Sequence, residues 1–276
     1  MAVAIDTVER IVHAALAEDI GAGDVTTEAT VPEDAFGSAG LLVKEPGLVC
    51  GLVVAETVFR ALDPDVRFEA FRRDGDLVET PAVVARIEGS QRAILTGERV
   101  ALNFLGRLSG VATLTRRYVD AVEGTGVAVL DTRKTTPGLR ALEKHAVVAG
   151  GGTNHRFGLD DAVLVKDNHL RAAGSIAAAV DLLRDATDLP VEVECDTLDQ
   201  VSEALDAGVD AILLDNMTLD ELREAVALAK GRARLEASGG VGLDTIRAIA
   251  ETGVDEISVG ALTHSARSLD VSLELT

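Results

Sequence analysis

Basic and histidine side chains are concentrated in one stretch of an otherwise acidic chain. Residues 131–171 read DTRKTTPGLRALEKHAVVAGGGTNHRFGLDDAVLVKDNHLR. This stretch holds four arginines, three lysines and three histidines, although the whole chain has a formal charge of −20. Guanidinium forks and lysine ammonium groups are the donors that carboxylates and phosphates need. The stretch therefore predicts a binding site for an anionic ligand.

Polar or glycine residues stand at the ends of six apolar, strand-like runs. The runs are 127–130, 162–166, 191–195, 211–214, 233–237 and 256–259, and helical stretches separate them at 137–149, 175–187, 197–207, 219–230 and 243–252. Alternating strands and helices imply βαβ units and a parallel sheet. In α/β barrels the carboxyl ends of the strands form the active face. We therefore expect the residues at these six ends to converge on one site.

Three of these strand ends carry candidate catalytic side chains. Lys166 directly follows the apolar residues 163–165, and Asp215 directly follows 212–214. Glu194 shares a strand face with Glu192, and inward charges in a barrel need partners, which Lys166 could supply. The alternatives are an exposed lysine at the barrel rim and a pair of buried structural carboxylates. Glu192 is expected to lie deeper, among the packed layers of the barrel interior.

Glycine-rich turns and a histidine–arginine pair add candidate anion-binding groups. Residues 238–242 and 260–261 lie at strand-to-helix turns, where backbone N–H groups can hold a phosphate, although such turns also occur for steric reasons alone. His155 and Arg156 follow three glycines, which is typical of a loop that grips a ligand. Asp160 and Asp161 are expected to form a cap or turn. His13 is expected at the surface, and the role of His145 stays open.

The first hundred residues have a different organisation. Residues 6–16 have helical spacing, residues 18–27 are expected to form a loop, and residues 55–61 a short helix. Strand-like runs lie at 40–44, 47–50, 66–72, 82–88 and 91–95. These predict an α+β sandwich with mostly antiparallel strands. A long helix over 97–122 is expected to join the two domains, with Gly106 and Gly110 marking close packing.

Composition narrows the class of protein. With 276 residues, 47% of them hydrophobic, the chain can build a large core. It shows neither an apolar run of about 18 residues nor a leader, so we expect a soluble, cytoplasmic protein without membrane partners. Cys50 and Cys195 lack metal-ligand spacing and are expected as reduced thiols. The acidic balance argues against nucleic acid and, with few lysines, suggests a high-salt host and stability that rises with KCl.

These residues resemble the quinolinate phosphoribosyltransferase family. The matching stretches are EDIGAGDVTT (18–27), GERVALNFLGRLSG (97–110), residues 131–170, VEVECDT (191–197), ILLDNM (212–217), EASGGV (236–241) and ISVGALTHSA (257–266). The resemblance implies a type II phosphoribosyltransferase fold. Residues 1–110 would form an N-terminal α/β sandwich, to which residues 267–276 return. Residues 111–266 would form an incomplete, seven-stranded α/β barrel. A homodimer or a dimer-based hexamer would be the assembly.

The resemblance also implies an activity and a set of site residues. The enzyme would join quinolinate to phosphoribosyl pyrophosphate with Mg2+, releasing pyrophosphate and CO2 and giving nicotinate mononucleotide for NAD biosynthesis. The quinolinate pocket would contain Thr132, Arg133, His155, Arg156 and Lys166, with Arg99 reaching in from the neighbouring subunit. Phosphoribosyl pyrophosphate would meet Lys134, Glu194, Asp215, Ser238, Gly239, Gly240, Val259, Gly260, Ala261 and His264. The catalytic set would be Lys134, Lys166, Glu194 and Asp215, with Glu194 and Asp215 reaching the metal directly or through water.

Three other functions compete with this one. A phosphoribosyltransferase for nicotinate or another mono-acid would need fewer cations than Arg133, Arg156 and Lys166 together supply. A Schiff-base aldolase would use Lys166 at its strand end. A non-catalytic anion sensor would not need Glu194 and Asp215.

Overall fold

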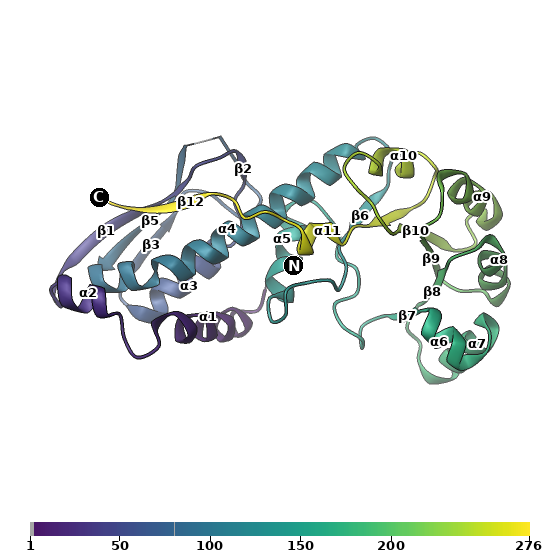
Figure 1. Ribbon diagram of the computed structural model, residues 1–276, viewed down its shortest axis with the longest axis horizontal. Helices are drawn as coiled ribbons and strands as arrows, with labels where there is room; N and C mark the ends of the chain where they lie inside the picture. Colours follow the sequence, from purple (N-terminus) through teal and green to yellow (C-terminus); the bar gives the residue numbers. More distant parts are fainter. Residues whose placement is uncertain (1–2, 80) are drawn as a thin grey trace. The chain divides into compact units, whose positions relative to one another are not determined.

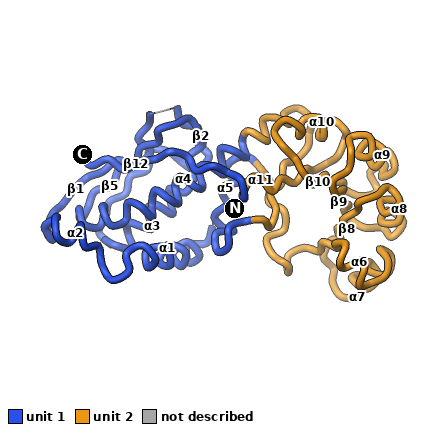
Figure 2. The backbone as a smooth tube through the Cα atoms, viewed as in Figure 1, with its two compact units in different colours: residues 1–116, 135–151, 263–276 blue, residues 117–134, 152–262 orange. Residues whose placement is uncertain are grey.

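The computed structural model describes residues 3–79 and 81–276 and divides into two compact units. The first unit comprises residues 1–116, 135–151 and 263–276, and the second comprises residues 117–134 and 152–262 (Figure 2). The domain boundary expected at residue 110 therefore falls inside helix α4 (Gln91–Ala121), which contributes to both units. Residues 135–151, expected in the second domain, pack with the first unit.

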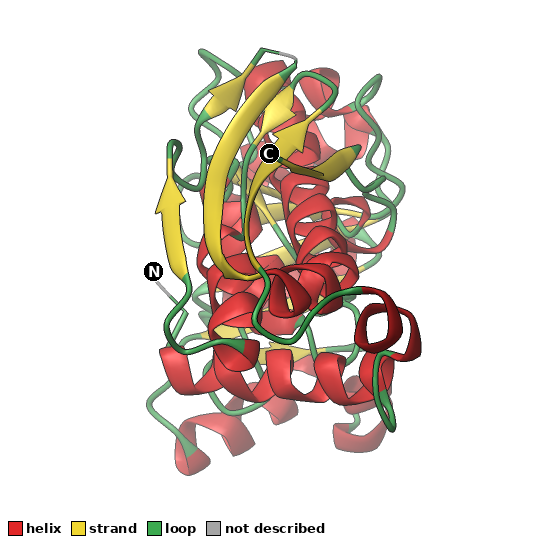
Figure 3. Ribbon diagram, turned by 90° about the vertical axis from the view of Figure 1, so that its left-hand side faces the viewer, coloured by secondary structure: helices red, strands yellow, loops and turns green. Residues whose placement is uncertain are grey.

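A four-stranded antiparallel sheet forms the centre of the first unit. Its strand order is β12 (Val271–Leu275), β1 (Phe36–Val43), β5 (Ala82–Ser90) and β3 (Arg67–Ala70). The C-terminal strand β12 pairs with β1, so the end of the chain supplies an edge strand of this sheet. A second, two-stranded sheet pairs β2 (Gly47–Leu48) with β4 (Leu77–Val78). Figure 3 shows these strands in yellow.

The helices of the first unit are α1 (Ile5–Ile20), α2 (Val25–Thr30), α3 (Leu52–Leu62), the first part of α4, and α5 (Arg140–Ala149), and some of them lie alongside this sheet. α1, α3 and α4 run alongside the strands, and α1 contacts α3 (Figure 1). Leu41, Phe59 and Ile87 are fully buried between the layers. The predicted α+β arrangement of antiparallel strands and helices is confirmed for this part of the chain.

Two local predictions are wrong, and in both cases a helix begins where another structure was expected. Residues 91–95 form the first turn of α4 rather than a strand, and the hydroxyl of Ser90 accepts a hydrogen bond from Ala93 N at 3.4 Å. Part of the expected loop 18–27 is helical, because α2 starts after Asp24, whose carboxylate accepts from Thr27 N at 3.0 Å. Both helix starts have a serine or aspartate at the N-cap position, which is a signal that the sequence does contain.

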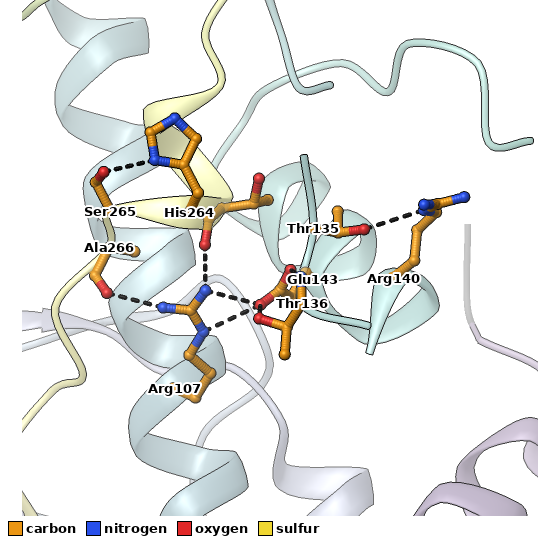
Figure 4. Close-up of polar contacts among 9 residues, drawn as sticks. Arg107, Thr135, Thr136, Arg140, Glu143, His264, Ser265 and Ala266 are labelled. Atoms are coloured by element: carbon orange, nitrogen blue, oxygen red, sulfur yellow. Dashed lines mark hydrogen bonds and ion pairs between the residues drawn. The ribbon is translucent and has the colours of Figure 1, made fainter. Parts of the chain in front are cut away.

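A buried ion pair connects four segments of the first unit (Figure 4). Arg107 on α4 donates from Nε and Nη2 to the carboxylate of Glu143 at 3.1 and 2.7 Å, and that carboxylate is fully buried. The guanidinium also donates to the carbonyl oxygens of Ala266, at 2.8 Å, and Thr263. Glu143 in turn accepts from the backbone N and the hydroxyl of Thr136. The pair therefore links α4, α5, the turn before α5 and residues 263–266, at and after the end of α11.

Close packing at a glycine of α4 confirms another prediction. A Cβ atom added at Gly110 would overlap the carbonyl oxygen of Arg267. The C-terminal segment therefore lies directly against the backbone of α4, and only glycine allows this approach.

A parallel sheet of six strands forms the second unit. In order they are β6 (Ala128–Leu130), β11 (Glu256–Ser258), β10 (Arg234–Ser238), β9 (Ala211–Asp215), β8 (Val191–Cys195) and β7 (Val163–Val165). All six strands lie within a few residues of their predicted positions. The resemblance implied seven strands, and in the described residues an isolated bridge between Leu130 and Thr153 takes the seventh position, next to β6. A single bridged residue is too short to count as a strand, so the sheet has six.

Helices follow the strands as a βαβ pattern requires. They are α6 (Asp167–Ala173), α7 (Ile176–Ala186), α8 (Leu198–Ala207), α9 (Leu219–Ala229), α10 (Ile246–Ala250) and α11 (Ala261–His264). Three of them begin with a hydroxyl side chain that accepts from a backbone N–H of the first turn: Ser175, Thr197 and Thr218. Among the described residues, no helix combines the length and the apolar character that a bilayer crossing requires.

Candidate active site

A cavity of about 440 Å³ opens at the carboxyl ends of the parallel strands, and every residue that lines it belongs to the second unit. Its lining comprises Thr132, Arg133, Lys134, His155, Arg156, Leu164, Lys166, Glu194, Leu213, Asp215, Asn216, Glu236, Ser238, Gly239, Gly240 and Ser258. Strand register explains the convergence, because Asp215 lies opposite Ser238 and Leu213 opposite Glu236 on neighbouring parallel strands. Alternate residues of each strand therefore face the same cavity.

The structure gathers most of the predicted site residues but not all of them. Eleven line the cavity: Thr132, Arg133, Lys134, His155, Arg156, Lys166, Glu194, Asp215, Ser238, Gly239 and Gly240. Val259, Gly260 and Ala261 follow β11 in the same unit but are not part of this lining. Arg99 is exposed on α4, and His264 is exposed at the end of α11, both in the first unit. Their predicted roles stay predictions.

Lys166 and Glu194 form an ion pair across two neighbouring strands. The ammonium Nζ lies 2.8 Å from Glu194 Oε2, and the side chains are 48% and 16% exposed. A pair this exposed adds little to stability. Its consequence is geometric, because it holds the lysine ammonium group over the cavity.

Arg133 lies close enough to Arg156 to disfavour the charge of Arg156. Burial, and next to it the charge of Arg133, lower the pKa of Arg156 from its usual range. Arg156 donates from Nη1 to the carbonyl of Ala162 at 3.3 Å, which orients its guanidinium. Like charges held near each other in a pocket favour an anion that binds between them.

Asp215, Asn216 and Gly239 form a compact turn after β9 and β10. Asn216 has a positive φ of 55°, and its amide donates to Asp215 Oδ2 at 2.7 Å. Gly239 has a φ of 97°, and a Cβ atom there would overlap the side-chain oxygen of Asn216. This glycine is therefore required by sterics alone, so its presence is not in itself evidence of phosphate binding. Asn216 was not among the predicted site residues, although the Asp-Asn pair after an apolar strand marked its position.

His155 sits between two buried glutamates at the floor of the cavity. Its Nε2 atom lies 3.3 Å from Glu192 Oε2 and 3.2 Å from Glu236 Oε2. Burial of the ring disfavours its charged form, but the hydrogen bonds and charges of Glu192 and Glu236 outweigh burial and raise the pKa of His155. The backbone N–H of Arg156 points at Nδ1, 2.7 Å away, and opposes a proton there. The proton that the two glutamates hold is therefore the one on Nε2.

Comparison with known proteins agrees with this geometry. Residues 24–109 match the family described as quinolinate phosphoribosyl transferase, N-terminal domain, and residues 111–274 match the C-terminal domain of the same description. This chain belongs to that family.

Relatives of this protein are similar to it in sequence over nearly its whole length. A probable nicotinate-nucleotide pyrophosphorylase [carboxylating] of Synechocystis is 47% identical, and one of Bacillus subtilis is 44% identical. Each alignment covers 94% of this chain and 90% of the relative. Among solved structures, NadC from Streptococcus pyogenes is 43% identical with a TM-score of 0.96, covering 100% of this chain and 99% of that one.

Another carboxylate–imidazole cluster of this family member lies in its first unit. Asp74 Oδ1 accepts from the backbone N of Gly51 and Leu52 at 3.0 and 3.2 Å, at the start of α3. Asp74 Oδ2 accepts from His145 Nε2 at 2.8 Å and from the Cys50 thiol at 3.6 Å. Burial raises the pKa of Asp74, but the hydrogen bonds from His145 and Leu52 outweigh it, so the pKa is lowered. Each carboxylate oxygen thus has donors, which indicates a structural role for His145.

Three smaller predictions have clear outcomes. His13 is exposed on α1, as expected. Asp161 accepts hydrogen bonds from Phe157 N and Gly158 N, so it forms the expected turn before β7. Cys50 and Cys195 are both free and buried, which agrees with the prediction of packed, reduced thiols.

Proposed function

We propose that this chain transfers the phosphoribosyl group of phosphoribosyl pyrophosphate to quinolinate and decarboxylates it. The products are nicotinate mononucleotide, pyrophosphate and CO2, and the reaction serves NAD biosynthesis. The observation that carries the proposal is the cavity itself. Its lining includes Arg133, Lys134, Arg156 and Lys166 together with Glu194 and Asp215, in a chain of the quinolinate phosphoribosyl transferase family.

The cationic side of the cavity binds the acid. Quinolinate carries two adjacent carboxylates, and Arg133, Arg156 and Lys166 supply three cations for them. The mutual repulsion of the two guanidinium groups is relieved when a carboxylate lies between them. Lys166 is aimed by its contact with Glu194. Holding the ring by two carboxylates fixes its nitrogen for attack on the ribose carbon, which is the main gain from such positioning.

The remaining residues serve the phosphoribosyl group. Departure of pyrophosphate builds positive charge on the ribose carbon, and the carboxylates of Glu194 and Asp215 stabilise that charge. Lys134 and the backbone N–H groups of residues 238–240 hold phosphate oxygens. Val259, Gly260, Ala261 and His264 extend this phosphate site. After ring attachment the ring nitrogen is cationic, and it stabilises the carbanion left by CO2 together with the nearby arginine and lysine side chains.

Glu194 and Asp215 are also suited to hold a magnesium ion. Mg2+ prefers oxygen ligands and usually keeps several waters, so one or two protein carboxylates are enough. Glu194 Oε1 and Asp215 Oδ1 have no hydrogen-bond partner among the described residues, while the other oxygen of each accepts from Lys166 or Asn216. An ion held there would neutralise the leaving pyrophosphate.

Three measurements separate the proposal from its rivals: nucleotide formation, borohydride trapping and anion binding. Purified protein with phosphoribosyl pyrophosphate and Mg2+ should form nicotinate mononucleotide and CO2 with quinolinate, and no nucleotide with nicotinate. Nucleotide formation from nicotinate at a similar rate would favour the mono-acid enzyme. Borohydride trapping of a carbonyl substrate on Lys166 would favour the aldolase. Tight anion binding without turnover would favour the sensor.

We propose further that the active assembly is a homodimer or a dimer-based hexamer in which Arg99 enters the partner's cavity. Its exposure on α4, and its absence from the cavity lining of its own chain, support this. Co-expressing Arg99→Ala with Lys166→Ala tests it, because a mixed dimer has one site with both residues intact. Activity well above either variant alone is expected. No recovery in isolated mixed dimers would contradict the role of Arg99.

A cytoplasmic location completes the proposal. It is supported by the two free cysteines, since a reducing compartment keeps such thiols unpaired.

A further inference from the structure

Two buried glutamates at the floor of the cavity, of which Glu236 is part of the lining, have no role in the reaction described above. Glu192 on β8 and Glu236 on β10 have side chains only 8% and 1% exposed. Each directs its Oε2 atom at Nε2 of His155, at 3.3 and 3.2 Å. Their Oε1 atoms have no hydrogen-bond partner within residues 3–79 and 81–276. All the hydrogen bonding of these two carboxylates therefore goes to one imidazole.

Burying two carboxylates that each keep an oxygen without a partner among the described residues costs folding free energy, and a function of these residues would account for this cost. A buried carboxylate is disfavoured without a counter-charge or a full set of donors. In addition, negative charge beneath an anion-binding cavity works against binding of the anion. His155 lies within ion-pair distance of both carboxylates, and the charge of Glu192 also acts on the neighbouring Arg156, so the two glutamates act on this pair of residues.

His155 makes three polar contacts, and one of them is with the backbone of Arg156. Its Nε2 faces the glutamates, and its backbone N–H donates to Asp131 Oδ1 at 2.9 Å, on a fully buried side chain. Its Nδ1 accepts from the backbone N–H of Arg156 at 2.7 Å. Both ring nitrogens therefore have protein partners. Binding of substrate carboxylates falls to the neighbouring guanidinium and ammonium groups, and the ring fixes the backbone from which Arg156 extends.

We infer that Glu192 and Glu236 are positioning residues, which hold the His155 ring and thereby place the Arg156 guanidinium for a carboxylate of quinolinate. The inference rests on the proposed function, because Arg156 needs an acidic substrate to bind. It concerns quinolinate because both glutamates contact His155, whose ring accepts from the backbone N–H of the proposed quinolinate ligand Arg156. Removing a glutamate should therefore weaken the binding of one substrate only.

The test is a comparison of two substitutions at Glu236. Glu236→Ala should raise the KM for quinolinate at least about tenfold, as misplacement of a binding group does. The KM for phosphoribosyl pyrophosphate should stay within about twofold and kcat within about threefold. Glu236→Gln keeps an oxygen that can accept from Nε2–H, so its KM for quinolinate should be close to that of the unmodified chain. A purely structural role would lower the melting temperature of both variants without separating the two KM values.

Glu256→Ala is the matched control. Glu256 lies opposite Glu236 on the neighbouring strand β11, but its carboxylate pairs with Arg234 Nε at 2.8 Å. Both KM values of this variant should match those of the unmodified chain.

Two outcomes would overturn the inference, and a third, which can be told apart from them, would overturn the proposed function. Glu192→Ala carries the same expectation as Glu236→Ala, and it keeps the test open if Glu236→Ala does not fold. Folded alanine variants with a quinolinate KM within twofold of the unmodified chain overturn the inference. If neither alanine variant folds, the glutamates are stabilising elements and the inference is equally overturned. An unmodified chain that forms no nucleotide from quinolinate overturns the proposed function instead.

Discussion

The two carboxylate–imidazole clusters of this protein use the same residue types in opposite ways. In the first unit, both oxygens of Asp74 accept hydrogen bonds, from two backbone N–H groups of α3, from His145 and from Cys50. In the second unit, Glu192 and Glu236 each keep one oxygen without a partner among the described residues, and their imidazole lines a cavity with four cations. The carboxylate of the first cluster is fully satisfied, as a structural group is expected to be, whereas the unpartnered oxygens of Glu192 and Glu236 lie beside a cavity with perturbed charged groups.

The largest effect is expected where a buried charge of the first unit loses its partner. Arg107→Ala should lower the free energy of unfolding by about 3–5 kcal/mol, because it leaves the fully buried Glu143 carboxylate without its counter-charge. Urea denaturation measures this loss. Arg60→Ala is the control, since its pair with Glu56 is exposed and should contribute less than about 1 kcal/mol. Equal losses in both variants would show that burial of this pair is unimportant.

In the cavity the same kind of substitution should affect turnover instead of stability. Lys134→Ala and Lys166→Ala should each reduce kcat/KM by at least about 10²-fold, as loss of a charge-stabilising donor does. Their melting temperatures should stay close to that of the unmodified chain, because neither side chain is buried. Nucleotide formation and thermal unfolding are the measurements, with the exposed Lys44→Ala as control. Near-normal kinetics in both variants would remove the assignment of the site.

Asp74→Ala tests whether the carboxylate–imidazole cluster of the first unit contributes to stability and not to activity. The substitution removes the acceptor for two N–H groups at the start of α3 and for His145, so the free energy of unfolding should fall by about 1–3 kcal/mol. Since this cluster is fully satisfied, kcat/KM should remain within twofold. A loss of activity at unchanged stability would mean that the first cluster is also functional.

The smallest effect is expected at the two cysteines. Burial raises the pKa of Cys50, and burial together with Asp196 raises the pKa of Cys195 to about 12. A raised thiol pKa means that the reactive thiolate is scarce at pH 8. Ellman's reagent should therefore label both thiols slowly in the folded protein and rapidly in urea. Fast labelling of folded protein at pH 8 would identify one of them as reactive.

Much of the second unit could be predicted from local patterns. Runs such as VEVEC and AILLD are short and apolar, and turns with glycine, aspartate or asparagine follow them, so β8 and β9 were placed within a residue. The βαβ rule then predicted that Lys166, Glu194 and Asp215 share one edge of the sheet. Glu236 was missed, although it had a detectable signal. It is an acidic residue inside an apolar strand, just as Glu192 is.

The first unit shows where local patterns are insufficient. Residues 91–95 are a short run whose composition suits a strand or a helix, and only the long continuation of α4 and the cap at Ser90 decide between them. Likewise, no local signal indicated that residues 135–151 pack with the first unit. Contacts such as that of Glu143 with Arg107, 36 positions away, determine that packing.

The alternation of strands and helices in the second unit, the family, and the residues that end each strand followed from sequence alone. Periodicity and turn residues are local properties, which the chain carries in any conformation. Only tertiary structure showed that Glu192 and Glu236 meet at His155, while Asp74 and His145 form a closed cluster elsewhere. The difference lies in which donors reach each carboxylate oxygen, and segments distant in the chain supply those donors.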